Sequence, residues 1–292
     1  MERVLGPEHR DTLTTRHSLA RWTGEAGDAA GARDQYAALL PINDRTLGSE
    51  HPHTLNDRGQ LASWTGDAGD AAGARDQLAA LLPTRERVLG PEHPDTLTTR
   101  GNLARWTGEA EDAAAARDLL AALVPVEGRV LGHEHPETLD ARHNLARWTG
   151  EAGDPAAARD LLAALLPVRE RVNGPEHPDT LWCRHSLARW TGEAGDPAAA
   201  RDLLAALLPV EERVLGPQHP DTLWTAPTLP AGRGRQATRR PPATCSRPCC
   251  PSASGPSAPG TRPPWTRVPI SPNGRVKRRA DPGDMRRPGI LC

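Results

Sequence analysis

Residues 93–131 read HPDTLTTRGNLARWTGEAEDAAAARDLLAALVPVEGRVL, and this stretch holds the signals for two consecutive helices. The first is predicted to begin at Pro94 and Asp95, because proline suits a first turn and aspartate favours the positive end of the helix dipole. Apolar residues then recur at helical spacing, at Leu97, Leu103, Ala104 and Trp106. Gly108 is predicted to end this helix.

A second helix is predicted to begin after Asp112, whose carboxylate can cap the free backbone amides of a first turn. Pro125 interrupts this helix, and we expect a kink there because proline removes a backbone hydrogen bond. The helix is expected to resume and to end at Gly132. Its apolar face consists of Ala116, Leu119, Leu120, Ala122 and Leu123.

The same pattern recurs every 42 residues. A Trp-Thr-Gly block is carried by Trp22, Trp64, Trp106, Trp148 and Trp190. A linker histidine keeps the same step, at His9, His51, His93, His135, His177 and His219. One helix pair cannot bury both of its faces, so each pair must pack on its neighbours. The sequence therefore predicts an all-α solenoid of antiparallel helix pairs.

The chain divides into two parts near Trp224. Residues 1–224 hold five complete helix pairs and the start of a sixth. The complete pairs cover about 9–47, 51–89, 93–131, 135–173 and 177–215. Residues 226–292 carry 13 basic and 2 acidic side chains, so the tail has a net charge of +11 and the remainder a net charge of −12.

The repeats resemble tetratricopeptide repeats. The resemblance is carried by Asn102-Leu103-Ala104, by Gly153-Asp154 and by Ala158, and it covers about residues 1–224. The 42-residue period with its Gly-Pro-Glu-His-Pro-Asp-Thr-Leu linker is similar to the longer kinesin-light-chain type. This resemblance implies a right-handed superhelix whose first helices line a concave face that binds peptides or helices of other proteins.

The resemblance also places particular residues on the concave face. It implies that His17, His143 and His185 lie there, with Arg21, Arg105, Arg147 and Arg189 one turn further along. A ladder of arginines favours acidic peptide segments, because a guanidinium pairs with a carboxylate through two hydrogen bonds. The alternative is that these arginines face solvent or pair with nearby glutamates.

A second arginine series has its own interpretation. Arg16, Arg58, Arg100, Arg142 and Arg184 recur in the first helices, and Asp34, Asp76, Asp118, Asp160 and Asp202 recur in the second. We expect these two series to form a structural ladder of ion pairs in preference to a ligand site.

The linker histidines invite a metal hypothesis, with Glu8–His9, Glu92–His93 and Glu134–His135 as candidate ligands. A zinc site needs three or four converging ligands. One histidine per stacked repeat separates the rings by roughly the 10 Å width of a helix, so we expect a loop or capping role instead. No nucleophile or phosphate-loop motif is present, and we predict neither a cofactor nor an enzyme.

The first six residues lack the apolar centre of a signal peptide, and no apolar run approaches the roughly 18–20 residues that span a bilayer. The repeats contain one cysteine, Cys183, which gives no reason to expect an oxidising compartment. We therefore expect a cytoplasmic protein without membrane contact.

The tail, residues 225–292, is rich in proline and arginine and is predicted to be disordered. It could be a nucleic-acid-binding arm or a metal-binding cluster of Cys245, Cys249 and Cys250. We prefer a third interpretation, a repeat translated in a shifted frame. Gly232 would supply the last two bases of a Trp codon 42 residues after Trp190. Codon third bases that are incompatible with a hidden repeat would refute it.

Two function classes remain from the sequence. The first is a scaffold that binds a peptide or protein in the concave groove, as the sensor part of a larger signalling protein. The alternative is a truncated, frameshifted fragment of a longer repeat protein without independent function. Near-identical repeats are also expected to associate end to end. Nucleic acid is not expected to be a partner, because only the basic tail supports it.

Overall fold

A computed structural model describes residue 6, residues 8–219 and residues 222 and 225. Residues 226–292 lie outside the described residues, and so do the shifted repeat, the basic arm and the cysteine cluster predicted for the tail. Within them every regular element is a helix, and the helices follow one another in five pairs. The first helices of the pairs are α2 (Arg10–Glu25), α4 (Pro52–Asp67), α6 (Pro94–Glu109), α8 (Pro136–Glu151) and α10 (Pro178–Glu193). The second helices are α3 (Ala29–Thr46), α5 (Ala71–Leu89), α7 (Ala113–Val130), α9 (Pro155–Val172) and α11 (Pro197–Val214).

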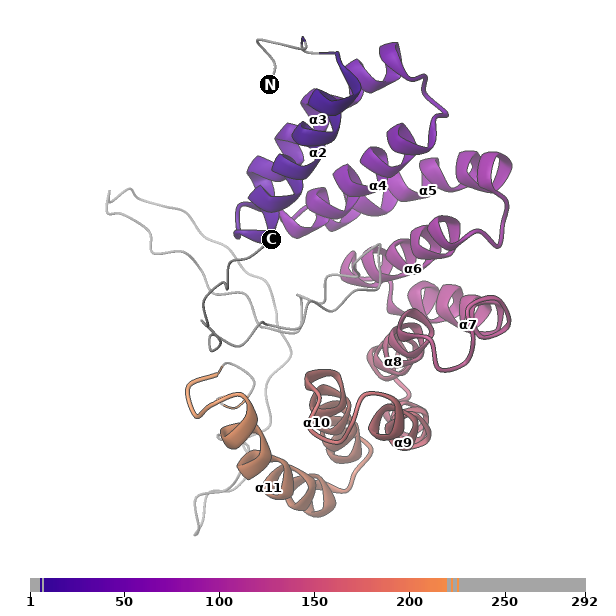
Figure 1. Ribbon diagram of the computed structural model, residues 1–292. Helices are drawn as coiled ribbons and strands as arrows, with labels where there is room; N and C mark the ends of the chain where they lie inside the picture. Colours follow the sequence, from indigo (N-terminus) through magenta and orange to yellow (C-terminus); the bar gives the residue numbers. More distant parts are fainter. Residues whose placement is uncertain (1–5, 7, 220–221, 223–224, 226–292) are drawn as a thin grey trace, which may run out of the picture.

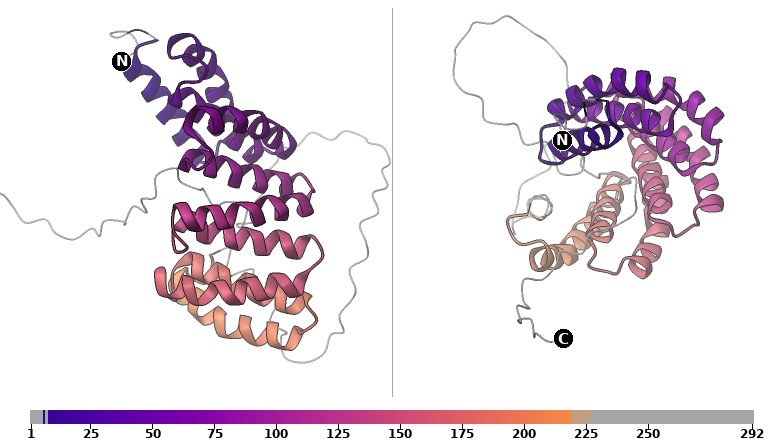
Figure 2. Two further views of the ribbon diagram at one scale, coloured as in Figure 1. Left: turned by 90° about the vertical axis from the view of Figure 1, so that its right-hand side faces the viewer. Right: turned by 45° about the horizontal axis from the view of Figure 1, so that its top comes forward.

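The pairs stack into a curved solenoid. Each helix packs against the helices before and after it, and α4, α6, α8 and α10 also touch one another in succession. Figure 1 shows these first helices along the inside of an arc, with α5, α7 and α9 outside, and Figure 2 shows the helices layered one above another. The predicted all-α solenoid is confirmed. None of the described helices is both long and apolar enough to cross a membrane.

The first helices begin as the capping interpretation of the histidines predicts. His93 is the N-cap of α6, and its ring nitrogen Nδ1 accepts a hydrogen bond from the amide of Asp95 at 3.2 Å. The same arrangement occurs at the N-caps His9, His51, His135 and His177. The imidazole thus satisfies one of the backbone amides that a helix start leaves unpaired.

The second helices begin at the predicted aspartate caps. The Asp112 carboxylate accepts a hydrogen bond from the Ala115 amide at 3.0 Å, and Asp28, Asp70, Asp154 and Asp196 make the equivalent bond. The turn before each cap needs a left-handed backbone, which glycine supplies at Gly27, Gly69, Gly153 and Gly195. The third repeat has Glu111 at this position, with a φ of 72°.

The helical prolines do not end the second helices. Helix α7 continues through Pro125 to Val130. Pro125 is exposed, and so is Ala121, whose carbonyl oxygen loses its helical partner. Solvent can therefore satisfy that oxygen, which explains why the helix tolerates the proline. Gly132, with a φ of 111°, follows the end of α7 as predicted.

The core consists of clusters that each span neighbouring repeats. Leu97 and Ala104 of α6 pack with Leu120 of α7, and the same cluster includes Ala141 and Trp148 of α8. Alanines of one helix thus pack against leucines and a tryptophan of its neighbours. The apolar face of each repeat is therefore buried only when the next repeat is in place.

Candidate functional site

The Trp-Thr-Gly block joins consecutive repeats. A side-chain carbon added at Gly108 of α6 would lie 2.5 Å from the indole ring of Trp148 on α8. The same contact joins Gly24 to Trp64, Gly66 to Trp106 and Gly150 to Trp190. Gly108 lies inside α6 and is buried, so the expectation that it ends the helix was wrong. Its role is to make room for the next repeat's tryptophan.

Replacement of Gly108 by alanine is therefore expected to lower the free energy of unfolding by about 1–3 kcal/mol, because the methyl group and the Trp148 ring cannot occupy the same space. Urea titration followed by circular dichroism measures this loss.

The matched control is Gly101→Ala in the same helix, where the added carbon meets only Leu123 Cδ2, at 3.7 Å. That change is expected to stabilise the protein by about 0.5–1 kcal/mol, because alanine favours a helix interior more than glycine does. Equal effects of the two substitutions would contradict the role of Gly108.

In three repeats the arginine before the tryptophan adds an ion pair to the preceding repeat. The Arg105 guanidinium lies 4.3 Å from the centre of the Trp106 ring, and its Nη2 is 3.1 Å from Asp67 Oδ1 of the preceding repeat. Arg147 pairs with Glu109 at 3.0 Å and Arg189 with Glu151 at 2.9 Å in the same way.

Each arginine of the predicted ladder already has an acidic partner. Arg21, in the first repeat, lies 4.0 Å from Glu25 of its own helix. Its neighbour Trp22 is 57% exposed, whereas Trp106, Trp148 and Trp190 are at most 4% exposed.

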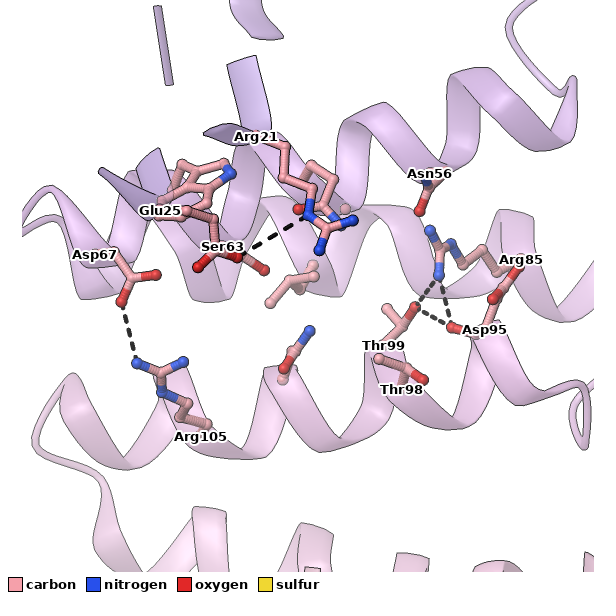
Figure 3. Close-up of a pocket in the computed structure, with 15 residues that line it drawn as sticks. Arg21, Glu25, Asn56, Ser63, Asp67, Arg85, Asp95, Thr98, Thr99 and Arg105 are labelled. Carbon is pink, nitrogen blue, oxygen red and sulfur yellow. Dashed lines mark hydrogen bonds and ion pairs between the residues drawn. The ribbon is translucent and has the colours of Figure 1, made fainter. Parts of the chain in front are cut away.

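The first helices α2, α4 and α6 surround a hollow of about 860 Å³, open solvent at its mouth included. Figure 3 shows Arg21, Glu25, Asp67 and Arg105 at one end and Arg85 with Asp95 at the other. Uncharged polar side chains occur between them at helical spacing, namely Asn56, Gln60 and Ser63 on α4 and Thr98 and Asn102 on α6.

The polar side chains of the hollow were not predicted as site residues. Asn56, Gln60, Ser63 and Asn102 are half-buried, and none of the four side chains is hydrogen-bonded within the part of the chain that the structure describes. A signal was present in the sequence, because these positions differ between otherwise near-identical repeats.

The three predicted histidines lie outside this hollow. His17 packs beside Tyr36 and its Nδ1 is 2.5 Å from the Asp57 carboxylate. His143 is buried and stacks on Trp182 with ring centres 3.6 Å apart. Burial lowers the pKa of His143 well below its usual value. His185 Nδ1 is 3.2 Å from Thr225 Oγ1. These side chains join neighbouring repeats, whereas Arg21 and Arg105 line the hollow.

The second arginine series does not pair with the predicted aspartates. Arg100 pairs with Glu86 at 2.7 Å and Arg184 with Glu170 at 2.6 Å, which are residues of the preceding second helix. Asp118 is exposed and pairs with the adjacent Arg117. The expected ladder was therefore wrong in its acidic partner, since the aspartates lie on the outer surface of the second helices.

One position in the second helix of each pair holds a buried polar residue, which was not predicted from the sequence. The residues are Asn43, Arg85, Glu127, Arg169 and Glu211, and each is at most 5% exposed. The identity changes from repeat to repeat, while the buried leucine four residues earlier is the same in all five. This position therefore makes the interior neutral, basic or acidic, depending on the repeat.

Both buried arginines sit between oxygen atoms of the flanking first helices. Arg85 donates to Thr99 Oγ1 at 2.9 Å, to the Asp95 carbonyl at 2.6 Å and to the Leu55 carbonyl at 2.9 Å. Arg169 pairs with Asp140 at 2.6 Å and with Asp179 at 3.4 Å.

Comparison with known proteins identifies the family. Two tetratricopeptide repeat models match residues 54–126 and 151–210, and residues 12–53. Putative kinesin light chain nearly identical TPR-like repeats from Podosopora anserina are 28% identical and cover 70% of this chain and 97% of that chain, with a TM-score of 0.61. A single-substitution variant of the same repeats gives 28% identity, 70% and 96% coverage and a TM-score of 0.62.

BtubC (BKLC) from P. vanneervenii is 15% identical over 81% of this chain and 88% of its own, with a TM-score of 0.60, and it shares the fold. The search of the curated proteins gave no match.

Proposed function

Because the chain belongs to the tetratricopeptide repeat family, with repeats of the kinesin-light-chain type, we propose that it binds an extended segment of another protein in the hollow of α2, α4 and α6. Repeats of this family generally mediate protein–protein interaction. The finer proposal concerns where the segment lies and which atoms hold it.

The unpaired polar side chains of the hollow carry this proposal. Asn56, Gln60 and Ser63 are spaced by one helical turn on α4, and Asn102 faces the same hollow from α6. An amide side chain offers both a donor and an acceptor, so a row of them can hydrogen-bond the peptide groups of an extended chain. Half-buried polar groups without internal partners gain most from such bonds.

Charge contributes less than the sequence predicted. Arg105, Arg147 and Arg189 already pair with carboxylates, so an acidic peptide would have to displace an existing partner. Displacement exchanges one ion pair for another and yields little net free energy. We therefore assign the main contribution to hydrogen bonds with the ligand backbone.

Selection of random twelve-residue peptides on the full-length protein tests the proposal. Selected peptides are expected to lose about tenfold or more in affinity for the Asn102→Trp variant, which corresponds to about 1.4 kcal/mol, because the indole occupies the hollow.

The control is Asp118→Trp, which adds the same ring to an exposed position of α7 and is expected to leave the affinity unchanged. Peptides that bind wild type and Asn102→Trp equally, or a selection without any enrichment, would contradict the proposed function.

A further inference from the structure

The joint between the third and fourth repeats contains buried carboxyl groups where its neighbours contain a buried guanidinium. Glu127 of α7 stands at the position of Arg85 and Arg169 and is 3% exposed. Glu137 in the first turn of α8 is half-buried and stands at the position of Asp95 and Asp179, which flank those two arginines. The acid of the first turn is thus retained as Glu137, whereas the buried arginine is replaced by a second acid, Glu127.

Glu127 has no polar partner within the described residues. Its Oε2 is buried without a hydrogen bond, and no ion pair to this carboxyl group is formed by the part of the chain that the structure describes. The groups that face it are Glu137 and Asp140 of α8, and both carry the same sign of charge. Burial and these two neighbours raise the pKa of Glu127 to about 8.

Space exists beside this carboxyl group. A small hollow with interior room for about one water-sized group is lined by Gly101 of α6, by Glu127 of α7 and by Glu137, Ala141 and Asn144 of α8. An added carbon at Gly101 would meet only Leu123 Cδ2, at 3.7 Å. At the equivalent Gly59 that position is taken by the Arg85 guanidinium, whose Nη2 lies 3.0 Å from an added carbon.

The small hollow adjoins the larger one, because Thr98 lines both. A peptide segment that lies across α4 and α6 therefore passes the opening at Gly101. A side chain that enters there reaches Glu127 at the position that Arg85 occupies from within the protein one repeat earlier.

We propose that the joint formed by Gly101, Glu127, Glu137 and Ala141 receives a lysine or arginine side chain of the bound segment. The cation takes the place of the internal guanidinium of the neighbouring joints and pairs with Glu127 and Glu137. This inference rests on the proposed peptide-binding function and adds to it a requirement for one basic residue. The acidic ligand predicted from the arginine ladder would not meet that requirement.

The probe is a fluorescein-labelled twelve-residue peptide that alternates arginine and lysine with serine and alanine. Its counterpart carries citrulline and acetyl-lysine in place of arginine and lysine, so shape is retained and charge is removed. Fluorescence anisotropy with the full-length protein is expected to show binding of the basic peptide that is on the order of tenfold to a hundredfold tighter than that of its counterpart.

Two variants locate the cation. Glu127→Gln replaces the carboxyl group, which must ionise to pair with the cation, by a neutral amide of similar shape. Gly101→His fills the opening with the residue that His17, His143 and His185 supply in three other repeats. Both variants are expected to lose most of the preference for the basic peptide. Glu212→Gln removes one exposed carboxylate of α11 and is expected to retain it.

Equal binding of the two peptides would overturn the inference, and so would a preference that persists in Glu127→Gln. The proposed function would survive either result if uncharged peptides from the random selection still lost affinity for Asn102→Trp. Absence of any groove-dependent peptide would instead refute the proposed function itself.

Discussion

Replacement of Arg169 by alanine is expected to lower the free energy of unfolding by about 3–5 kcal/mol, the range typical of losing one member of a buried ion pair. Arg169 is 1% exposed and pairs with Asp140 at 2.6 Å. Burial raises the pKa of Asp140, and Arg169 opposes that rise. Without the guanidinium the half-buried carboxylate lies near other acids and has lost its ion-pair partner. Chemical denaturation followed by circular dichroism measures the loss.

The control lies two residues further along the same helix. Arg171 is 63% exposed and pairs with Glu134 at the surface, so Arg171→Ala is expected to leave the denaturation midpoint nearly unchanged. Asp140→Asn in the Arg169→Ala background is expected to recover part of the stability, because it removes the uncompensated charge. A loss that Asp140→Asn does not reduce would show that Arg169 acts through packing alone.

Glu127→Gln is expected to stabilise the free protein by about 4 kcal/mol at pH 8 and by less than about 1 kcal/mol at pH 5. Glu127 has a pKa of about 8 in the folded protein and 4.5 as its ordinary value. The folded state therefore holds a proton that the unfolded state releases between these two pH values. The stability that this proton provides is complete below pH 4.5 and is lost as the pH rises to about 8. Each pH unit in that window costs about 1.4 kcal/mol.

Thermal denaturation of wild type and Glu127→Gln between pH 5 and 8 measures the difference. Glu137, Asp140 and His143 also titrate differently in the folded state, but they are present in both proteins and largely cancel in the comparison. Glu212→Gln, an exposed substitution, is expected to change stability by less than about 0.5 kcal/mol. A difference between Glu127→Gln and wild type that does not grow with pH would show that the pKa of Glu127 is not raised in the folded protein.

The helix starts were predictable from the sequence because their causes are local. A cap such as Asp112 bonds an amide three residues away, and His93 bonds one two residues away. The same capping residues recur every 42 residues. The positions of all ten described helices therefore follow from the capping signals of one helix pair.

The joints between repeats were only partly predictable. The recurring arginine of which Arg105 is one copy was identified from the sequence. Its partner Asp67 was not identified, because it lies 38 residues away in the chain. Gly108 was taken for a helix end, because a glycine near a turn has that meaning when only neighbours in sequence are considered. Its contact with Trp148 appears only when two repeats are stacked.

The sequence by itself determined the repeat, its helices, their caps and the family, since these depend on residues a few positions apart. Tertiary structure alone decided which polar groups are buried and what faces them. Glu127 and Arg85 occupy equivalent positions with similar local sequence, yet Arg85 has internal partners and Glu127 does not. The reason is physical: burial and charge compensation are fixed by side chains of the next repeat, whose approach depends on the packing of whole helices.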